Sequence, residues 1–271
     1  MKLLNGLDVA SYIKNRQLAD SRALRQAHGV TPKLAIIRTN PDPIVDSYMK
    51  LKQSYGDEIA VDVEVHTIKQ DDAIKTIEML NKDKDVHGII VQIPLPDPSQ
   101  SDVILNTVKP NKDVDGLSDD SVFDAPTPIA ITWLLAAYNV DLKDKKILII
   151  GRGRLVGKPL EKLWKTTNLD VTVATKATKE LGDLTANADV IVSATGVPRL
   201  ITQSMIKPNA VIVDAGVATD KNGLIGDVAD DVRLMSDIKI TPEKGGVGPL
   251  TICALFDNVL RSARSSISGK L

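Results

Sequence analysis

Short runs rich in valine, isoleucine and leucine alternate with amphipathic stretches along most of the chain. Each run has the length of one buried strand, and the stretches between the runs are long enough for helices. This alternation is typical of βαβ units, in which a helix connects two parallel strands. We therefore expect an α/β fold. The expected strands lie at 33–39, 60–68, 87–96, the start of 145–164, 170–175, 188–196 and 209–216.

The spacing of these segments predicts two α/β lobes. Helices are expected over 42–59, 71–83 and 101–110 in the first lobe, and after the glycine-rich turn within 145–164 in the second. A long helical stretch at 127–140 is expected to join the lobes, and a last helix, roughly 250–265, to pack back on the first lobe. The Asn-Gly pair in "DKNGLIGDV" (220–228) predicts a small hairpin.

Composition excludes several classes of function. The 34 Lys and Arg residues balance 35 Asp and Glu residues, and aromatic residues make up only 3%, so neither nucleic acid nor a membrane surface is an expected partner. The single cysteine, Cys253, lies in an apolar run and indicates a reducing compartment. The histidines lack metal-ligand spacing, so we expect no metal. No apolar run approaches the roughly 18 residues of a membrane span. We expect a cytoplasmic protein.

The stretch "ILIIGRGRLVGKP" is the sharpest local signal, because a strand runs directly into Gly151, Gly153 and Gly157 and then into a helix. Glycine lets a backbone approach a pyrophosphate closely, and a helix amino terminus offers free N–H groups. The spacing is one residue longer than the common dinucleotide fingerprint, so a merely tight strand-to-helix turn remains an alternative. We interpret the stretch as a dinucleotide site in a Rossmann-like domain.

The next strand bears on the choice of cofactor. An NAD site usually ends this strand with an acid that binds the ribose hydroxyls. Here Thr175 and Lys176 stand at that place, and the first carboxylate is Glu180. With Arg152 and Arg154 in the glycine-rich loop, the local charge favours a 2′-phosphate. We expect NADP, with NAD possible. The alternative is that these cations are ordinary solvated side chains.

The stretch "SYMKLK" raises the question of which lysine does chemistry. Asp42 and Pro43 are typical of an N-cap and a first-turn proline, so a helix is expected to begin there. On a helix, Tyr48 and Lys52 lie one turn apart on one face, whereas Lys50 points to the other side. An ammonium group in a partly dry site has a lowered pKa and can exchange protons near neutral pH. The alternative is a solvated helix face.

Three further segments accompany this pair. Gln92 in "VQIPLP" stands at the carboxyl end of an expected parallel strand, where open α/β sheets bind ligands. Asp115 in "KDVDG" follows a later helix in a turn, a common place for a functional carboxylate. The glycines of "GGVGPLT" make a loop suited to close approach of a ligand.

Taken in order, "Y-x-x-x-K", "VQIPLP", "KDVDG", "GRGRLVGKP", "GDV" and "TPEKGGVGPLT" resemble the bifunctional methylenetetrahydrofolate dehydrogenase/methenyltetrahydrofolate cyclohydrolase family. The resemblance implies NADP-dependent oxidation of 5,10-methylenetetrahydrofolate and hydrolysis of the methenyl product to 10-formyltetrahydrofolate. It implies that Lys52, Tyr48 and Gln92 form the catalytic set, in which Gln92 assists Lys52, and that Asp115 and Tyr48 bind the pterin. The resemblance completes the expected sites with Gly246 and Pro249 for folate, and Thr195, Gly196 and Val217 for the cofactor.

The resemblance also implies an organisation. Residues 1–122 plus 250–271 would form the folate-binding catalytic domain and 123–249 the NAD(P)-binding domain, with an active-site cleft between them. A homodimer and a place in one-carbon metabolism and purine biosynthesis are further expectations. Departures include a shorter segment after "KDVDG" and "ATKAT" in place of "CHS-x-T". Two alternatives remain: an NADP-dependent dehydrogenase of small acids, like shikimate dehydrogenase, and a dinucleotide-binding protein that has lost folate chemistry.

Overall fold

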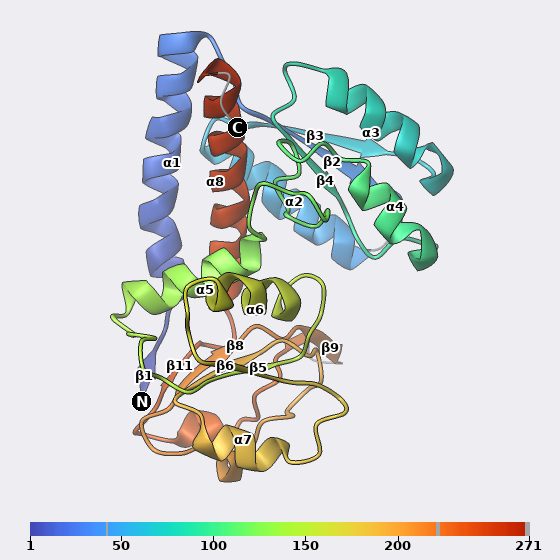
Figure 1. Cartoon of the computed structure of the whole chain (residues 1–271). Helices are drawn as coiled ribbons and strands as arrows, with labels where there is room; N and C mark the ends of the chain where they lie inside the picture. Colours follow the sequence, from blue (N-terminus) through green and yellow to red (C-terminus); the bar gives the residue numbers. More distant parts are fainter. Residues whose placement is uncertain (42, 221–222, 269–271) are drawn as a thin grey trace. The chain divides into compact units, whose positions relative to one another are not determined.

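The computed structural model describes residues 1–41, 43–220 and 223–268, and the chain divides into two compact units (Figure 1). The three-stranded unit comprises Ser11–Pro126 and Ile252–Leu271, and the six-stranded unit comprises Met1–Ala10 and Thr127–Thr251. Each is built on a parallel sheet accompanied by helices. The α/β fold expected from the alternation of strands and helices is confirmed.

The three-stranded unit has the strand order β3-β2-β4, with all pairs parallel. Its sheet is short because each strand contains only four to six residues. Its elements are α1 (Gly6–His28, shared with the other unit), β2 (Lys33–Arg38), α2 (Pro43–Glu58), β3 (Asp62–Thr67), α3 (Ala73–Lys82), β4 (Gly88–Val91), α4 (Ser101–Asn106) and the 3₁₀ turns Gln70–Asp72 and Pro98–Gln100.

Both faces of this sheet are covered. Alternate residues of β2 and β4 pack against α3 and α4 in one apolar cluster, and Figure 1 shows these two helices together on one side. On the other side, the ring of Tyr55 from α2 lies 5.1 Å from that of Phe256 in α8 (Val247–Ser268). α1 runs beside α8, and Gln17 donates a hydrogen bond to the Cys253 carbonyl (2.7 Å). The expected packing of the last helix on the first lobe is confirmed.

The six-stranded unit has the strand order β1-β11-β8-β7-β5-β6, and every pair is parallel. The buried side chains of β5 and β7 alternate between two faces, so both faces are apolar, as expected where helices flank a parallel sheet. Its elements are β1 (Lys2–Leu3), α5 (Pro126–Ala137), β5 (Ile147–Ile150), α6 (Gly157–Lys165), β6 (Val171–Ala174), α7 (Leu181–Asn187), β7 (Val190–Ser193), β8 (Val211–Asp214), β9 (Ala218–Asp220), β10 (Gly223–Ile225), β11 (Lys239–Ile240) and the 3₁₀ turns Gln203–Met205 and Val232–Leu234.

Several details differ from the expectation. Residues 1–10 were expected in the folate domain, but they belong to the six-stranded unit because β1 pairs with β11. The long helix α1 was not expected. β9 and β10 form the expected antiparallel hairpin, whereas Asn222 of its turn and Asp42, the expected N-cap of α2, lie outside the described residues. Among the described residues, no helix is long and apolar enough to cross a membrane.

Candidate functional site

Lys52 lies on α2, four residues after Tyr48, and its amine does not extend into open solvent. The Lys52 amine donates a hydrogen bond to Oε1 of Gln92 (2.9 Å). Tyr48 has 37% of its surface exposed, so its ring is open on the helix face that it shares with Lys52. Lys50 is exposed. The helix geometry expected from the sequence therefore separates the two lysines correctly.

Gln92 follows β4 directly, at the carboxyl end of the sheet. Its N–H donates to the Ile37 carbonyl (2.9 Å), which continues the pairing of β4 with β2 for one more residue. Its side-chain amide is also held, because Nε2 donates to the Ile93 carbonyl (3.2 Å). The two hydrogen bonds of the side chain fix which end of the amide faces the lysine: the oxygen accepts from Lys52 and the nitrogen is used elsewhere.

Asp115 lies in the turn that follows a parallel bridge between Asp113 and Ile89 of β4. The N–H of Ile89 donates to the Lys112 carbonyl (2.7 Å), so this segment is attached to the edge of the sheet. α8 also holds it, because Asn258 donates to the carbonyls of Val114 (2.9 Å) and Asp124 (3.0 Å). The turn that carries Asp115 is thus fixed from two sides.

Burial and charge act together on Lys52 and Asp115. Burial lowers the pKa of the Lys52 amine below its ordinary value, and the negative charge of Asp115 partly opposes this shift. Burial raises the pKa of the Asp115 carboxyl to about 6; Lys52 opposes the shift, and the like charge of Asp113 adds to it. Both groups are therefore moved toward exchanging protons nearer neutral pH. Such a pair is suited to acid–base chemistry.

Sequence reasoning missed residues at the same edge of the sheet. Arg38 is the last residue of β2, and Thr39 follows it. Thr39 is buried, and its hydroxyl has no hydrogen-bond partner. Asp113 is 3% exposed and stands next to the expected pterin residue. Their position after a strand, or two residues before Asp115, was the available signal, since ligands bind at the carboxyl ends of parallel strands.

The glycine-rich loop lies at the carboxyl end of β5 in the six-stranded unit. Gly151 has φ +97° and its N–H donates to the Ala174 carbonyl of β6 (2.9 Å). A Cβ on Gly157, the first residue of α6, would lie 2.0 Å from the Gly151 carbonyl oxygen. Gly153 has open space where its Cβ would be. The first and last glycines are therefore needed for the turn itself, while the exposed middle of the loop is open to a ligand.

The cations predicted for the cofactor site lie at neighbouring strand ends of this unit. Arg152 and Arg154 are exposed in the loop after β5, and Lys176 is exposed in the turn after β6. One nitrogen of the Arg152 guanidinium already has a partner, because Nε donates a hydrogen bond to Glu161 on α6 (2.8 Å). The Arg152 and Lys165 side chains both lower the pKa of the Glu161 carboxyl, with Lys165 the larger cause. Thr175, not an acid, follows β6.

Thr195, Gly196 and Val217 gather at the carboxyl ends of β7 and β8. A Cβ on Gly151 would lie 2.5 Å from the Ala194 carbonyl oxygen, and one on Gly196 would lie 3.4 Å from that of Val217. Thr195 is held by a buried carboxylate that the sequence reading did not identify. Asp227 accepts, on one oxygen, the Thr195 N–H (2.7 Å), the Thr195 hydroxyl (2.9 Å) and the Ser193 hydroxyl (2.6 Å).

Gly246 and Pro249, expected at the folate site, fall in the six-stranded unit, whereas Tyr48, Lys52, Gln92 and Asp115 fall in the three-stranded unit. Gly246 is buried just before α8. Pro249 stands in the first turn of α8, where a missing N–H costs no hydrogen bond. The structure therefore brings Lys52, Gln92 and Asp115 together and places the other two in the unit that carries the glycine-rich loop.

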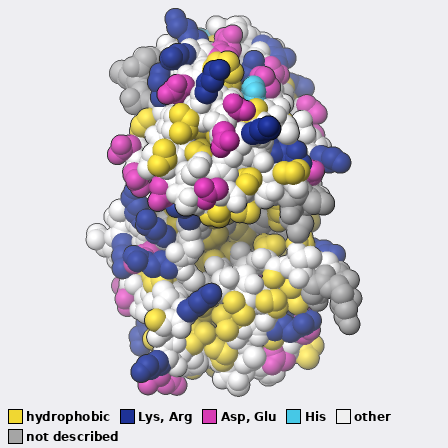
Figure 2. Space-filling model, turned by 90° about the vertical axis from the view of Figure 1, so that its right-hand side faces the viewer, with side chains coloured by type: hydrophobic (Ala, Val, Ile, Leu, Met, Phe, Trp, Pro, Cys, Tyr) yellow, Lys and Arg dark blue, Asp and Glu magenta, His cyan; other side chains and the backbone are white. Residues whose placement is uncertain are grey.

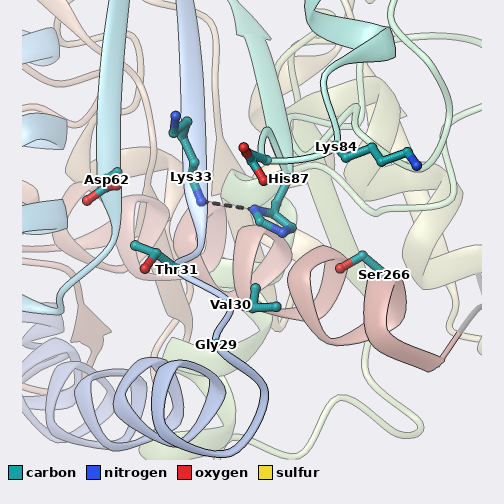
Figure 3. A pocket seen from close by; sticks show the side chains of 9 residues that line it. Gly29, Val30, Thr31, Lys33, Asp62, Lys84, His87 and Ser266 are labelled. Carbon is teal, nitrogen blue, oxygen red and sulfur yellow. Dashed lines mark hydrogen bonds between the residues drawn. The ribbon is translucent and has the colours of Figure 1, made fainter.

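A polar hollow of about 340 Å³ lies elsewhere in the three-stranded unit, at the amino ends of its strands (Figure 3). His87 lines it, and Nδ1 of its ring accepts the Lys33 N–H (3.2 Å). This is the opposite end of β4 from Gln92, so the hollow is not part of the Lys52 site. On the face of the molecule in Figure 2, acidic and basic side chains are interspersed, with no broad area of one sign.

Comparison with known proteins also divides the chain into two domains, although residues 4–10 and 252–267 are matched to the other domain than in the structure. The catalytic-domain model of the tetrahydrofolate dehydrogenase/cyclohydrolase family matches residues 4–115, and the NAD(P)-binding-domain model of that family matches residues 125–267. The bifunctional protein FolD of Lactobacillus acidophilus is 34% identical over 276 residues, covering 97% of each chain. The crystal structure of the Campylobacter jejuni FolD methylenetetrahydrofolate dehydrogenase/cyclohydrolase has a TM-score of 0.93 at 33% identity, covering 98% of this chain and 99% of that one.

Two other solved structures bear on the alternatives. The Trypanosoma brucei FolD enzyme, solved with NADP cofactor and an inhibitor, has a TM-score of 0.92 at 27% identity and covers 98% of both chains. The Thermus thermophilus shikimate 5-dehydrogenase reaches only a TM-score of 0.56 at 13% identity, over 86% of this chain and 99% of that one, which is a likeness of fold alone. The shikimate alternative is therefore not favoured. The chain belongs to the tetrahydrofolate dehydrogenase/cyclohydrolase family and is a bifunctional methylenetetrahydrofolate dehydrogenase/cyclohydrolase.

Proposed function

We propose that the protein oxidises 5,10-methylenetetrahydrofolate with NADP and hydrolyses the methenyl product to 10-formyltetrahydrofolate, with Lys52 as the acid–base group. The observation that carries this proposal is the hydrogen bond between Lys52 and Gln92 near the partly buried Asp115 carboxyl. Burial lowers the pKa of Lys52, which an amine needs if it is to accept a proton near neutral pH.

In the hydrolytic step, Lys52 takes a proton from the water that attacks the methenyl carbon. It then returns that proton to the ring nitrogen that departs when the five-membered ring opens, while the hydroxyl of the adduct loses its own proton to solvent and becomes the formyl carbonyl. Gln92 holds the amine in place during both transfers, because its own amide is fixed by the Ile93 carbonyl. A cationic substrate beside the amine lowers its pKa further, which favours the neutral, proton-accepting form.

Asp115 and Tyr48 bind the pterin in this proposal. The Asp115 carboxylate accepts hydrogen bonds from the amino and ring N–H groups, and the ring of Tyr48 stacks on the pterin from the same helix face as Lys52. Gly246 and Pro249 supply further folate contacts. Holding the one-carbon bridge in a fixed orientation supplies much of the rate of hydride transfer.

The dinucleotide-binding residues fit an NADP molecule. The turn at Gly151 and Gly157 requires glycine, and the cations Arg152, Arg154 and Lys176 lie at the ends of β5 and β6, where no carboxylate occupies the ribose position. Gly153, Thr195, Gly196 and Val217 complete this proposed site. When bound, the nicotinamide ring accepts the hydride. The NADP complex of the Trypanosoma brucei enzyme supports this choice, while the NAD-dependent enzyme of Saccharomyces cerevisiae, 20% identical with a TM-score of 0.80 over 98% of both chains, shares the fold.

The proposal assigns folate binding mainly to the three-stranded unit and dinucleotide binding to the six-stranded unit. It includes a homodimer in the cytoplasm that serves one-carbon metabolism and purine biosynthesis. Cys253 is the single cysteine of the sequence and is buried, and a chain with no internal disulfide is typical of a reducing compartment. Size-exclusion chromatography with light scattering tests the dimer, which a mass of a single 29.2 kDa chain would contradict.

An absorbance assay tests the reaction and the cofactor together. The protein is incubated with methylenetetrahydrofolate and either NADP or NAD, and formation of the reduced nucleotide and of methenyltetrahydrofolate is followed. We expect turnover with NADP at lower concentrations than with NAD. Lys176→Ala should raise KM for NADP and leave KM for NAD unchanged, whereas Lys179→Ala, an exposed lysine three residues on, should change neither. Equal use of both nucleotides by the unaltered protein would refute the NADP preference.

A further inference from the structure

Asp113 is a buried carboxylate that the proposed reaction does not use. It is 3% exposed, and its Oδ2 accepts two hydrogen bonds from one residue, the Ser118 N–H (2.8 Å) and the Ser118 hydroxyl (2.7 Å). A buried carboxylate that accepts two hydrogen bonds is a strong local anchor, because hydrogen bonds to an ionised group are stronger than those between neutral groups. Asp113 therefore closes the segment 113–118 into a fixed turn around Asp115.

The backbone of Asp113 holds the same turn from a second direction. Its carbonyl accepts the Gly116 N–H (3.1 Å) and the Ser121 hydroxyl (3.0 Å), and the Ser121 oxygen in turn accepts the Phe123 N–H (3.2 Å). Gly116 has φ +65°, and a Cβ there would lie 2.8 Å from the Ala125 nitrogen. The short segment that leads from "KDVDG" to α5 is thus folded directly onto Asp113.

Asp113 also adds negative charge beside Asp115. The charged groups that act on Asp115 are Lys52, from α2, and Asp113, from its own segment. They act in opposite directions: the cation favours the ionised carboxyl, and the second carboxylate disfavours it. The Lys52 amine donates its hydrogen bond to Gln92 and not to Asp113. Its influence on the site passes through Asp115.

We propose that Asp113 is a positioning residue for the folate reaction: through Ser118 it fixes the turn that presents Asp115 to the substrate. Because the turn holds the two carboxyl groups two residues apart, the Asp113 charge also makes Asp115 harder to ionise. This inference rests on the proposed function, because it assigns Asp113 to the same folate site. The two carboxylates then have different roles. Asp115 contacts the pterin, and Asp113 holds Asp115 in place and adds negative charge beside it.

Asp113→Asn tests the charge, because an amide oxygen can still accept the Ser118 donors while the negative charge is gone. Carbon-13 NMR of labelled aspartate carboxyl groups follows the titration of Asp115, whose resonance is identified by its absence in Asp115→Asn. We expect the Asp115 midpoint, about 6 in the unaltered protein, to fall by about half a pH unit or more in Asp113→Asn. The acidic limb of the profile of kcat/KM for methylenetetrahydrofolate should move to lower pH by the same amount.

Two further variants separate the charge from the turn. Ser118→Ala removes one anchoring bond and keeps the Asp113 charge, so we expect a higher KM for methylenetetrahydrofolate, a kcat reduced by a smaller factor, and an unmoved Asp115 midpoint. Asp120→Asn, which removes an exposed carboxylate from the same segment, is the matched control and should change none of these.

The outcomes are distinguishable from those of the proposed function. An Asp115 midpoint that does not move in Asp113→Asn overturns the tuning role, and an unchanged KM in Ser118→Ala overturns the anchoring role. A uniform loss of activity at every pH in Asp113→Asn, with the midpoint unmoved, would mean that Asp113 is merely structural. If the unaltered protein did not turn over methylenetetrahydrofolate, the proposed function would fail, while the NMR titration would still decide whether Asp113 acts on Asp115.

Discussion

The Lys52 amine lies 2.9 Å from Oε1 of Gln92, a residue forty positions later in the chain. The two side chains come from different elements, since Lys52 is on α2 and Gln92 follows β4. Their contact places the amine at the carboxyl end of a parallel sheet, next to a carboxyl whose pKa is raised to about 6.

Replacing Gln92 with leucine should slow hydrolysis of methenyltetrahydrofolate by about 10- to 100-fold, because loss of the acceptor leaves the Lys52 amine unpaired and free to rotate. The KM for folate should change little, since Gln92 is assigned no pterin contact. Hydrolysis is measured by the loss of methenyl absorbance. Gln53→Leu, an exposed glutamine next to Lys52 in the chain, is the matched control. Equal rates in the two variants would remove Gln92 from the mechanism.

The pH dependence of kcat/KM should show an acidic limb near pH 6. Asp115 must be ionised to accept hydrogen bonds from the pterin, and burial, the main cause, raises its pKa to about 6. Activity should therefore fall as the pH drops below about 6. At the basic end, the lowered pKa of Lys52 places the change in amine charge below the ordinary lysine value. Initial rates of NADPH formation from pH 5 to 10 measure the acidic limb, and the loss of methenyl absorbance over the same range measures the Lys52 transition. Asp115→Asn carries no charge at any pH, so it should show low activity throughout, with no limb near pH 6.

Asp115→Asn should also change stability in a pH-dependent way. The raised pKa means that the folded protein holds this proton more tightly than the unfolded chain, so ionisation costs folding free energy as pH rises from about 4 to about 6. Removing the charge should therefore stabilise the protein at pH 8 relative to pH 4, by on the order of 1–3 kcal/mol. Urea unfolding at the two pH values measures the difference. A stability gap that is the same at both would contradict the raised pKa.

Gly157→Ala should destroy dinucleotide binding, because the new Cβ would lie 2.0 Å from the Gly151 carbonyl oxygen and the turn would have to open. Gly182→Ala is the matched control: this glycine lies in α7, a Cβ there meets no neighbour within 4 Å, and alanine favours a helix. NADP binding is measured by calorimetry, with circular dichroism as a check on folding. Full NADP affinity in Gly157→Ala would show that the turn is not the cradle.

Much of the fold could be predicted because the strands are buried on both faces and therefore read as continuous apolar runs. α1 was missed for a physical reason. Its buried stripe includes Ala10, Ile13 and Leu24, but Gln17 and Ser21 also lie on it and are almost fully buried. Gln17 is satisfied by the Cys253 carbonyl and Ser21 by the Ala60 carbonyl, contacts that no local pattern reveals. Polar residues at core positions hide the helical period.

The candidate site, like the fold, could be predicted only in part from the sequence. Lys52 and Tyr48 could be placed on one helix face from their spacing alone, and Gln92 at a strand end from the run before it. Asp113 and Asp227 lie in the quoted motifs "KDVDG" and "GDV", but their contacts could not be predicted from the sequence. Asp113 anchors Ser118 in a loop that bridges to β4, and Asp227 holds Thr195 from thirty-two residues away. Sequence spacing predicts which residues share an element and leaves open which loops meet.

The most direct test of the account is the rate of methenyltetrahydrofolate hydrolysis by Lys52→Met, in which a side chain of similar length carries no amine. We expect the enzymatic rate to fall by at least about 10²- to 10⁴-fold, the usual contribution of a positioned acid–base group, while the variant stays folded and binds NADP with unchanged affinity. Cyclohydrolase turnover equal to that of the unaltered protein would contradict the account, since the proton would then have to pass through another group.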